Sequence, residues 1–303
     1  MASALIVAEA PAVEAQGARA ALRGALRSRR LLIGLCVVGF FVLVAIFGPL
    51  LTSDPNAISR QLNQPPSAAH WFGTTNVGQD IFAQTVAATR PTLLIGAAAG
   101  LIATAVSVII GIGGGFLGGL ADELLALLTN VALVIPTLPL VIVASRFMGS
   151  NGLTPTIFVI AFTSWAASAR VLRGQTLSLR GRDYILAARA LDEPRWRIVL
   201  VELLPNELPI IVSQFTFSMI FAILGQAGLA FLGLQSADLL TWGNILYFAQ
   251  NAEALSSGQW WWFAPAGLCI ALFGAGLALI NFGLDELLNP RLRVYREKGR
   301  KRP

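Results

Sequence analysis

Long apolar runs alternate with short polar segments along the chain, and this pattern predicts a membrane protein built from helices. A helix needs roughly 20 apolar residues to cross a hydrocarbon core of about 30 Å. The six runs that approach or exceed the required length are residues 31–51, 92–119, 124–148, 154–169, 208–234 and 263–284. Pro136 and Pro139 lie within the third run and predict a kink there. We therefore expect an all-α, polytopic membrane protein with six transmembrane helices.

The basic residues gather in three of the polar segments, and their placement predicts the topology. Of 22 Lys and Arg residues, five lie in residues 1–30, seven in residues 170–197 and seven in residues 291–302. Lys and Arg are enriched in cytoplasmic segments, so both termini and the middle cluster are expected in the cytoplasm. The net charge of +6 is thus a topology signal, aided by attraction to anionic lipid, and a nucleic-acid partner is not needed to explain it.

Spans and charge together give a domain organisation. We expect a cytoplasmic tail at 1–30, a first transmembrane helix at 31–51, an extracytoplasmic loop at 52–90, a five-helix core at 91–288 with a charged cytoplasmic loop at 175–206, and a basic cytoplasmic tail at 289–303. A second extracytoplasmic loop, residues 235–262, ends in three tryptophans, which are typical of a membrane interface.

The charged cytoplasmic loop has the pattern of an exposed helix-turn-helix. One apolar stripe recurs at i, i+3, i+4 and i+7, formed by Tyr184, Ala187, Ala188 and Leu191. Its alanines would let a partner's surface approach the helix backbone. The turn Asp192–Pro194 is expected to cap a second helix over residues 195–204, which Pro205 and Pro209 end. The alternative is an ordinary interfacial loop.

A narrow sector of the fifth run gathers small and polar side chains. These are Gln214, Ser218, Phe221, Gly225 and Gly228. Such a face either lines a transport pathway or packs against a neighbouring helix. The face is neutral, so a pathway here would accept a zwitterionic backbone without selecting side chains.

Composition excludes several kinds of chemistry. With 55% hydrophobic and 13% charged residues, the chain is too apolar for an ordinary soluble protein. Cys36 and Cys269 lie in apolar runs, and His70 is the sole histidine, so we expect no disulfide, metal site or catalytic residues. No GxxxxGK[ST] loop is present, and the spans hold no chain of ionisable residues like that of a proton-driven carrier. An energy source must therefore come from another subunit, and the chain is not expected to be an enzyme.

Four stretches resemble one family in the expected order. They are HWFGTTNVGQDIFAQ, AARAL with RIVLVELLPN, FLGLQSADLLTWGNIL and DELLNPRLR, which together extend over about residues 70–293. The chain resembles permease subunits of bacterial ATP-binding-cassette importers, most of all the dipeptide and oligopeptide branch. Gly73, Thr74, Gly78 and Asp80 match the family's first external motif, and Trp242, Gly243 and Asn244 match its second. The chain departs at Thr75 and Gln79, has Leu186 where Glu is usual, and has Asp192 where Gly is usual.

The resemblance implies a type I importer permease in the bacterial inner or plasma membrane, moving di- or oligopeptides into the cell. It implies a second permease subunit, two ATPase subunits that bind ATP and Mg, and an extracytoplasmic peptide-binding protein, with no cofactor in this chain. The residues expected to couple to the ATPases are Tyr184, Ala187, Ala188, Arg189, Ala190, Leu191 and Asp192. Alternatives are a permease for nickel, glutathione or another small solute, an ATP-independent carrier, and an intramembrane enzyme.

Overall fold

The computed structural model describes residues 28–148, 152–236 and 238–288. Within these ranges the regular structure is helical, apart from one isolated β-bridge between Thr74 and Asp80. The elements are α2 (Arg29–Leu51), α3 (Ile81–Leu117), α4 (Gly119–Val134), α5 (Thr137–Met148), α6 (Leu153–Leu179), α7 (Asp183–Ala190), α8 (Arg195–Arg197), the π-helical segment η1 (Ile198–Leu203), α9 (Leu204–Phe231), α10 (Trp242–Asn251) and α11 (Trp260–Leu288). The predicted tails lie outside the described residues, apart from residues 28–30.

Five helical segments in the described chain are long and apolar enough to cross a membrane: Arg29–Leu51, Ile81–Leu117, Leu153–Leu179, Arg195–Phe231 and Trp260–Leu284. The predicted third span is instead a broken pair, because α4 and the first part of α5 meet at an angle of 93°. The break falls at Ile135 and Pro136, so the predicted kink is a full interruption. The all-helical, polytopic fold predicted from the apolar runs is confirmed.

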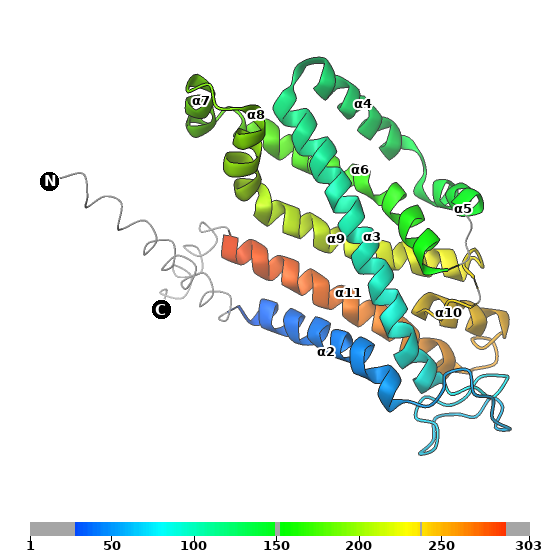
Figure 1. Ribbon diagram of the computed structural model, residues 1–303. Helices are drawn as coiled ribbons and strands as arrows, with labels where there is room; N and C mark the ends of the chain where they lie inside the picture. Colours follow the sequence, from blue (N-terminus) through cyan, green and yellow to red (C-terminus); the bar gives the residue numbers. More distant parts are fainter. Residues whose placement is uncertain (1–27, 149–151, 237, 289–303) are drawn as a thin grey trace, which may run out of the picture.

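Helix α3 is the centre of the bundle. It contacts α2, α6, α9 and α11, and Figure 1 shows it lying across the row formed by α2, α11 and α9. Two glycines permit this close approach. A Cβ at Gly100 would lie 3.0 Å from the backbone nitrogen of Met219 in α9, and one at Gly111 would lie 2.5 Å from the carbonyl oxygen of Ala169 in α6. Small residues at such contacts are typical of helix packing in membranes.

Helix α3 begins earlier than the hydropathy pattern predicts. Asp80 caps the helix by accepting a hydrogen bond from the backbone nitrogen of Ala83 at 3.0 Å. Residues 81–90 are therefore helical, and the prediction that they belong to a loop was wrong.

Helix α6 also exceeds its predicted length. Arg170 and Arg173, which follow the predicted fourth run at 154–169, are helical and bond to α4. Arg173 forms a two-point ion pair with Asp122, with distances of 2.6 and 2.9 Å, and Arg170 donates to the Asn130 side chain at 2.8 Å. Asp122 is buried within α4, where the ion pair compensates its charge.

The helix that follows α7 is continuous with the fifth span. Residues Arg195–Phe231 run as α8, η1 and α9, so Pro205 and Pro209 do not end a short second helix as predicted. The π-helical segment explains why the helix continues past Pro205. Leu204 donates its backbone N–H to Val199 five residues back, so the hydrogen-bond register has already shifted where Pro205, without an N–H, enters the helix.

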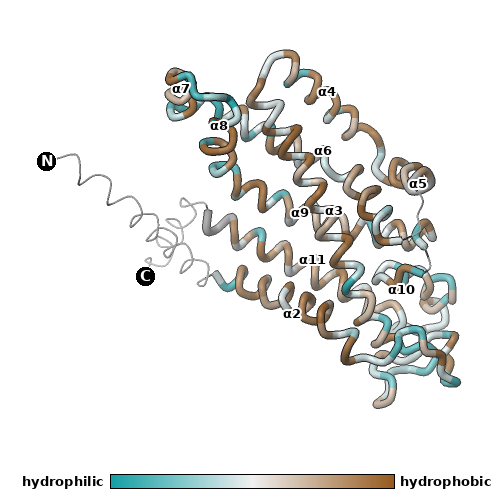
Figure 2. The backbone as a smooth tube through the Cα atoms, in the orientation of Figure 1, coloured by the Kyte–Doolittle hydropathy of each residue, from teal (hydrophilic) through white to brown (hydrophobic). Residues whose placement is uncertain are grey.

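The apolar spans end in two polar regions, at opposite ends of the molecule. Figure 2 shows hydrophilic residues gathered around α7 and α8 at one end, and around α10 and residues 52–80 at the other. The 235–262 segment is more deeply packed than a loop, because Trp242 is fully buried and donates from Nε1 to the Thr85 carbonyl at 3.1 Å. Of the three predicted interfacial tryptophans, Trp260 is exposed whereas Trp262 is buried.

Candidate functional site

A short helix projects from the bundle between two long ones. Helix α6 ends at Leu179, α7 occupies Asp183–Ala190, and the next long helix begins at Arg195. Figure 1 shows α7 and α8 projecting beyond the spans, at the end of the molecule away from α10. We call residues 180–197 the α7 loop.

One face of α7 is seated on the bundle. Ile185 is fully buried and Ala188 is 9% exposed. They pack in an apolar cluster with residues of α3, α6 and the π-helical segment, namely Ile112, Phe116, Leu172, Ile198 and Leu203. Three elements that approach from different directions therefore share one apolar core with α7.

The residues of the predicted apolar stripe do not share one face of α7: part of the stripe is buried against the bundle and the rest is exposed. Tyr184 is 38% exposed and Leu191 is 77% exposed, and Ala187 is exposed between them. Ala188 lies inward, so the prediction that all four stripe residues share one free surface was wrong for Ala188. The remaining candidates, Arg189, Ala190 and Asp192, are also exposed. The free surface of α7 thus combines two large apolar side chains with a small one.

Asp192 ends α7 in a left-handed conformation. Its φ is +54°, the backbone N–H of Glu193 donates to Ala188, and that of Asp192 donates to Arg189, both at 3.1 Å. This pair of hydrogen bonds is a Schellman motif, in which glycine is the usual residue at the left-handed position. Aspartate tolerates that conformation at some cost, so the turn is retained without the glycine.

Charged groups surround the junction between the α7 loop and α3. The guanidinium of Arg189 lies over the Phe116 ring, 4.9 Å from its centroid, and Arg180 donates to the Gly115 carbonyl at 2.9 Å near the C-terminus of α3. A hollow of about 310 Å³ lies between the loop and α3, lined by Phe116, Leu117, Arg189, Asp192, Glu193, Arg195 and Ile198.

The candidate pathway residues of α9 do not form one uniform face. Ser218 is buried, and its hydroxyl lies 3.4 Å from that of Ser168 in α6. Phe221 is 64% exposed, Gln214 is half-buried, and a Cβ added at Gly225 would have no neighbour within 4 Å. Ser218 is therefore a packing contact, whereas Gln214, Phe221 and Gly225 lie beside open space.

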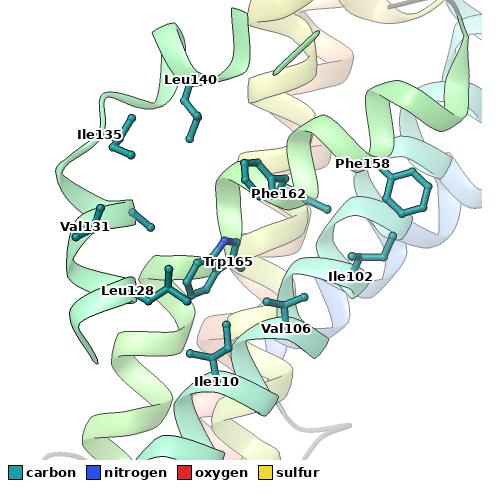
Figure 3. Close-up of a pocket in the computed structure, with 12 residues that line it drawn as sticks. Ile102, Val106, Ile110, Leu128, Val131, Ile135, Leu140, Phe158, Phe162 and Trp165 are labelled. Carbon is teal, nitrogen blue, oxygen red and sulfur yellow. The ribbon is translucent and has the colours of Figure 1, made fainter. Parts of the chain in front are cut away.

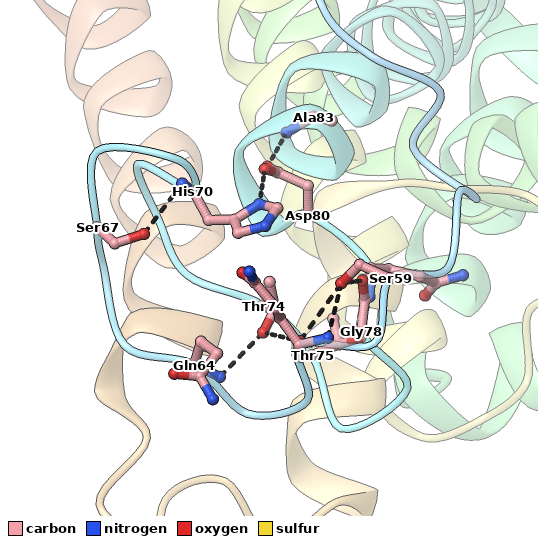
Figure 4. A network of polar contacts seen from close by, with 11 residues as sticks. Ser59, Gln64, Ser67, His70, Thr74, Thr75, Gly78, Asp80 and Ala83 are labelled. Carbon is pink, nitrogen blue, oxygen red and sulfur yellow. Dashed lines mark hydrogen bonds and ion pairs between the residues drawn. The ribbon is translucent and has the colours of Figure 1, made fainter.

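The 52–80 loop at the other end is held by hydrogen bonds among its own residues (Figure 4). Thr74 is buried, donates to the Gln61 carbonyl at 2.7 Å and accepts from the Gln64 backbone at 2.9 Å. Gly78 has a φ of +83°, and a Cβ there would lie 2.1 Å from the Ser59 carbonyl oxygen. At the start of α3, Asp80 accepts from His70 Nδ1 at 2.6 Å. The motif glycines and the Asp are thus structural residues of this loop.

An apolar pocket opens between α3, α4, α5 and α6 (Figure 3). Its volume is about 490 Å³, and the described residues that line it are all apolar or aromatic, among them Ile102, Val131, Phe162 and Trp165. It offers no charged group to a peptide terminus. No group of three or more His, Cys, Asp or Glu side chains in the described part of the chain is placed to hold a metal ion.

One pair of polar residues beneath the α7 loop went unnoticed in the sequence. Glu207 is fully buried in the first turn of α9 and lies 2.7 Å from the Thr176 hydroxyl of α6. The signal available was an acidic residue between two prolines at the edge of an apolar run.

Comparison with known proteins matches these features to one family. Residues 106–294 match the family model of the binding-protein-dependent transport system inner membrane component. Residues 18–66 match the N-terminal transmembrane domain of oligopeptide transport permease C.

Curated relatives agree over most of the chain. The oligopeptide transport system permease protein OppC of Bacillus subtilis is 34% identical over 272 residues, covering 88% of each chain. The dipeptide transport system permease protein DppC of the same organism is 33% identical, covering 88% of this chain and 83% of the relative. The probable D,D-dipeptide transport system permease protein DdpC of Escherichia coli is 33% identical, covering 84% and 85%. The chain belongs to the family of binding-protein-dependent transport system inner membrane components, as a membrane-spanning permease subunit and not an enzyme.

Proposed function

We propose that this chain is a permease subunit of an ATP-driven importer that moves di- or oligopeptides into the cell. Its partners in the proposal are a second permease subunit, two cytoplasmic ATPase subunits that bind ATP and Mg, and an extracytoplasmic peptide-binding protein. The peptide substrate rests on relatives whose names specify oligopeptide and dipeptide transport. The orientation rests on the basic clusters, which favour cytoplasmic termini and a cytoplasmic α7 loop.

The observation that carries the proposal is the two-sided character of α7. Ile185 and Ala188 fix the helix to the bundle, while Tyr184, Ala187 and Leu191 remain exposed outside the spans. Exposed apolar side chains that gather on one surface with polar residues at its edge mark a protein interaction site. We assign this surface, with Arg189, Ala190 and Asp192 at its edge, to contact with the ATPase.

Substitution of an exposed leucine at each end of the molecule tests whether the exposed face of α7 binds the ATPase. Leu191→Glu should remove the ATPase subunit from the complex purified in mild detergent, because the introduced carboxylate would be buried unpaired. Leu255→Glu is the matched control, since Leu255 is 75% exposed after α10, at the other end of the bundle. Mass spectrometry of the co-purified chains measures how much ATPase stays bound to each variant. An ATPase that stays bound to the Leu191→Glu protein would refute the assignment of α7.

We assign Gln214, Phe221 and Gly225 to the peptide pathway and retain Ser218 as a packing contact at its edge. Gly225→Leu should block peptide uptake in reconstituted vesicles while leaving the complex assembled, because the added side chain enters open space. Gly39→Leu is the control, since Gly39 of α2 likewise has no neighbour within 4 Å of an added Cβ. Equal uptake by both variants would identify this face of α9 as ordinary helix surface.

A further inference from the structure

Glu207 is a buried acid for which the proposed transport step has no role. Its side chain is fully buried, its Oε1 lies 2.7 Å from the Thr176 hydroxyl, and its Oε2 has no hydrogen-bond partner among the residues that the structure describes. An ionised carboxylate that leaves one oxygen buried without a protein donor is costly, because its charge is then poorly compensated.

The number of protons available at Thr176 indicates whether Glu207 is ionised or protonated. The Thr176 hydroxyl lies 2.9 Å from the Leu172 carbonyl oxygen as well as 2.7 Å from Glu207. A hydroxyl has one proton to donate, and a carbonyl oxygen can only accept. Both short contacts are satisfied at full strength when Thr176 donates to Leu172 and a protonated Glu207 donates to Thr176.

The nearby charged side chains are engaged elsewhere. In α6, Arg173 is paired with Asp122 of α4. At the end of α6, Arg180 donates to the Gly115 carbonyl of α3. Among the described residues no cation bonds to Glu207, which accords with a neutral acid at this position.

The contact between Thr176 and Glu207 joins the helix that enters the α7 loop to the helix that leaves it. Thr176 is in the last turn of α6, before the loop, and Glu207 is in the first turn of α9, after it. The contact also abuts α3, because a Cβ added at Gly115 would lie 2.9 Å from the Thr176 Cβ. One hydrogen bond thus closes the base of the loop on which α7 is carried.

We propose that Glu207, as a neutral carboxylic acid, is a positioning residue that clasps α9 to α6 beneath the α7 loop, so that force on α7 displaces both helices together. The inference rests on the proposed function, since it assumes that an ATPase acts on α7. Without the clasp, α7 could move with one helix while the other stayed in place, and ATP would be hydrolysed without import.

The test measures peptide imported per ATP hydrolysed in vesicles that contain this chain with its partner permease, ATPases and binding protein. Glu207→Gln should retain the ratio, because the amide can donate to Thr176 in the same way. Glu207→Leu and Thr176→Val should each lower the ratio by about fivefold or more, the factor that loss of one hydrogen bond produces. ATP hydrolysis should continue in both.

The double variant Glu207→Leu with Thr176→Val separates positioning from folding. It removes both polar partners, so its thermal stability should return towards that of the wild type, whereas its ratio should stay low. A wild-type ratio in Glu207→Leu, or an equal loss in Glu207→Gln, would overturn the proposal. Failure of the unaltered complex to import peptide with ATP would instead overturn the proposed function, whatever the variants do.

Discussion

The α7 loop and the 52–80 loop are both polar connections between spans, but they are stabilised in different ways. The 52–80 loop is held by hydrogen bonds between its own residues, such as those of Thr74 with Gln61 and Gln64. The α7 loop has its anchors, Ile185 and Ala188, in an apolar cluster that it shares with α3, α6 and the start of the fifth span.

This difference determines what each loop can transmit. A loop held mainly by its own hydrogen bonds transmits less of its displacement to the spans, and here Phe72 contacts Phe82 at the start of α3. A helix seated in a shared, close-packed cluster transmits part of its displacement to its neighbours, because packed interiors do not deform continuously. The contrast predicts that damage to the 52–80 loop stays local, whereas damage to the α7 seat affects the spans.

The largest effect is expected from Ile185→Ala. Removing a fully buried isoleucine should destabilise the seat of α7 by about 3 kcal/mol, because the cavity left behind is not refilled. Hydrogen exchange should accelerate in α7 and in the ends of α3 and α6 that lie beside it. Leu186→Ala is the control, since Leu186 is 50% exposed and should change little. Faster hydrogen exchange in α7 alone would contradict the inference that α7 shares one apolar cluster with α3 and α6.

The next effect is expected from Gly78→Ala. The added Cβ meets the Ser59 carbonyl oxygen and the backbone has a positive φ, so the 52–80 loop should lose about 2 kcal/mol or more of local stability. Gly258→Ala provides the comparison. Gly258 has a φ of +74° but open space, so its cost should be about 1 kcal/mol. Hydrogen exchange of residues 59–79 measures the effect, and any change in α7 would argue against local confinement.

A smaller effect is expected from His70→Ala. It removes the hydrogen bond to Asp80 but leaves that carboxylate as the cap of α3, at a cost of about 1.5 kcal/mol. Exchange should increase in the loop before α3 and remain unchanged within α3. Faster exchange along the whole of α3 would mean that the pair supports the span itself.

The smallest effect, and of opposite sign, is expected from Asp192→Gly. Glycine adopts the left-handed conformation without a Cβ penalty, so the end of α7 should gain about 0.7 kcal/mol. Thermal unfolding in detergent should show a slight increase in midpoint, and Asp192→Ala should show none. A decrease for the glycine variant would indicate that the aspartate side chain itself stabilises the turn.

The sequence predicted the existence of the spans better than their ends. Apolar runs are a sufficient signal for a helix in lipid, so the all-helical fold followed from them. The ends depend on single contacts that no hydropathy pattern contains. Asp80 starts α3 before its apolar run, and the ion pair with Asp122 allows α6 to continue through Arg173.

The candidate site was predicted in part for a similar reason. The spacing of Tyr184, Ala187 and Leu191 identified the exposed face of α7, but periodicity alone did not reveal that Ile185 seats the helix and draws Ala188 inward. The Thr176 and Glu207 contact joins residues from two helices across the α7 loop. A pairing of that kind becomes visible only when both helices have been placed.

Helix α3 extends over 37 residues, which at 1.5 Å per residue makes a rod of about 55 Å, almost twice the thickness of the hydrocarbon core. Its C-terminal end, at Phe116, touches the α7 cluster, and Thr85 near its N-terminal end accepts a hydrogen bond from Trp242. A rod converts rotation into displacement in proportion to its length. Tilting α3 by about 5° about its N-terminal end would shift its C-terminal end by about 5 Å. The protein therefore has, in its longest helix, a mechanical lever between its two polar ends.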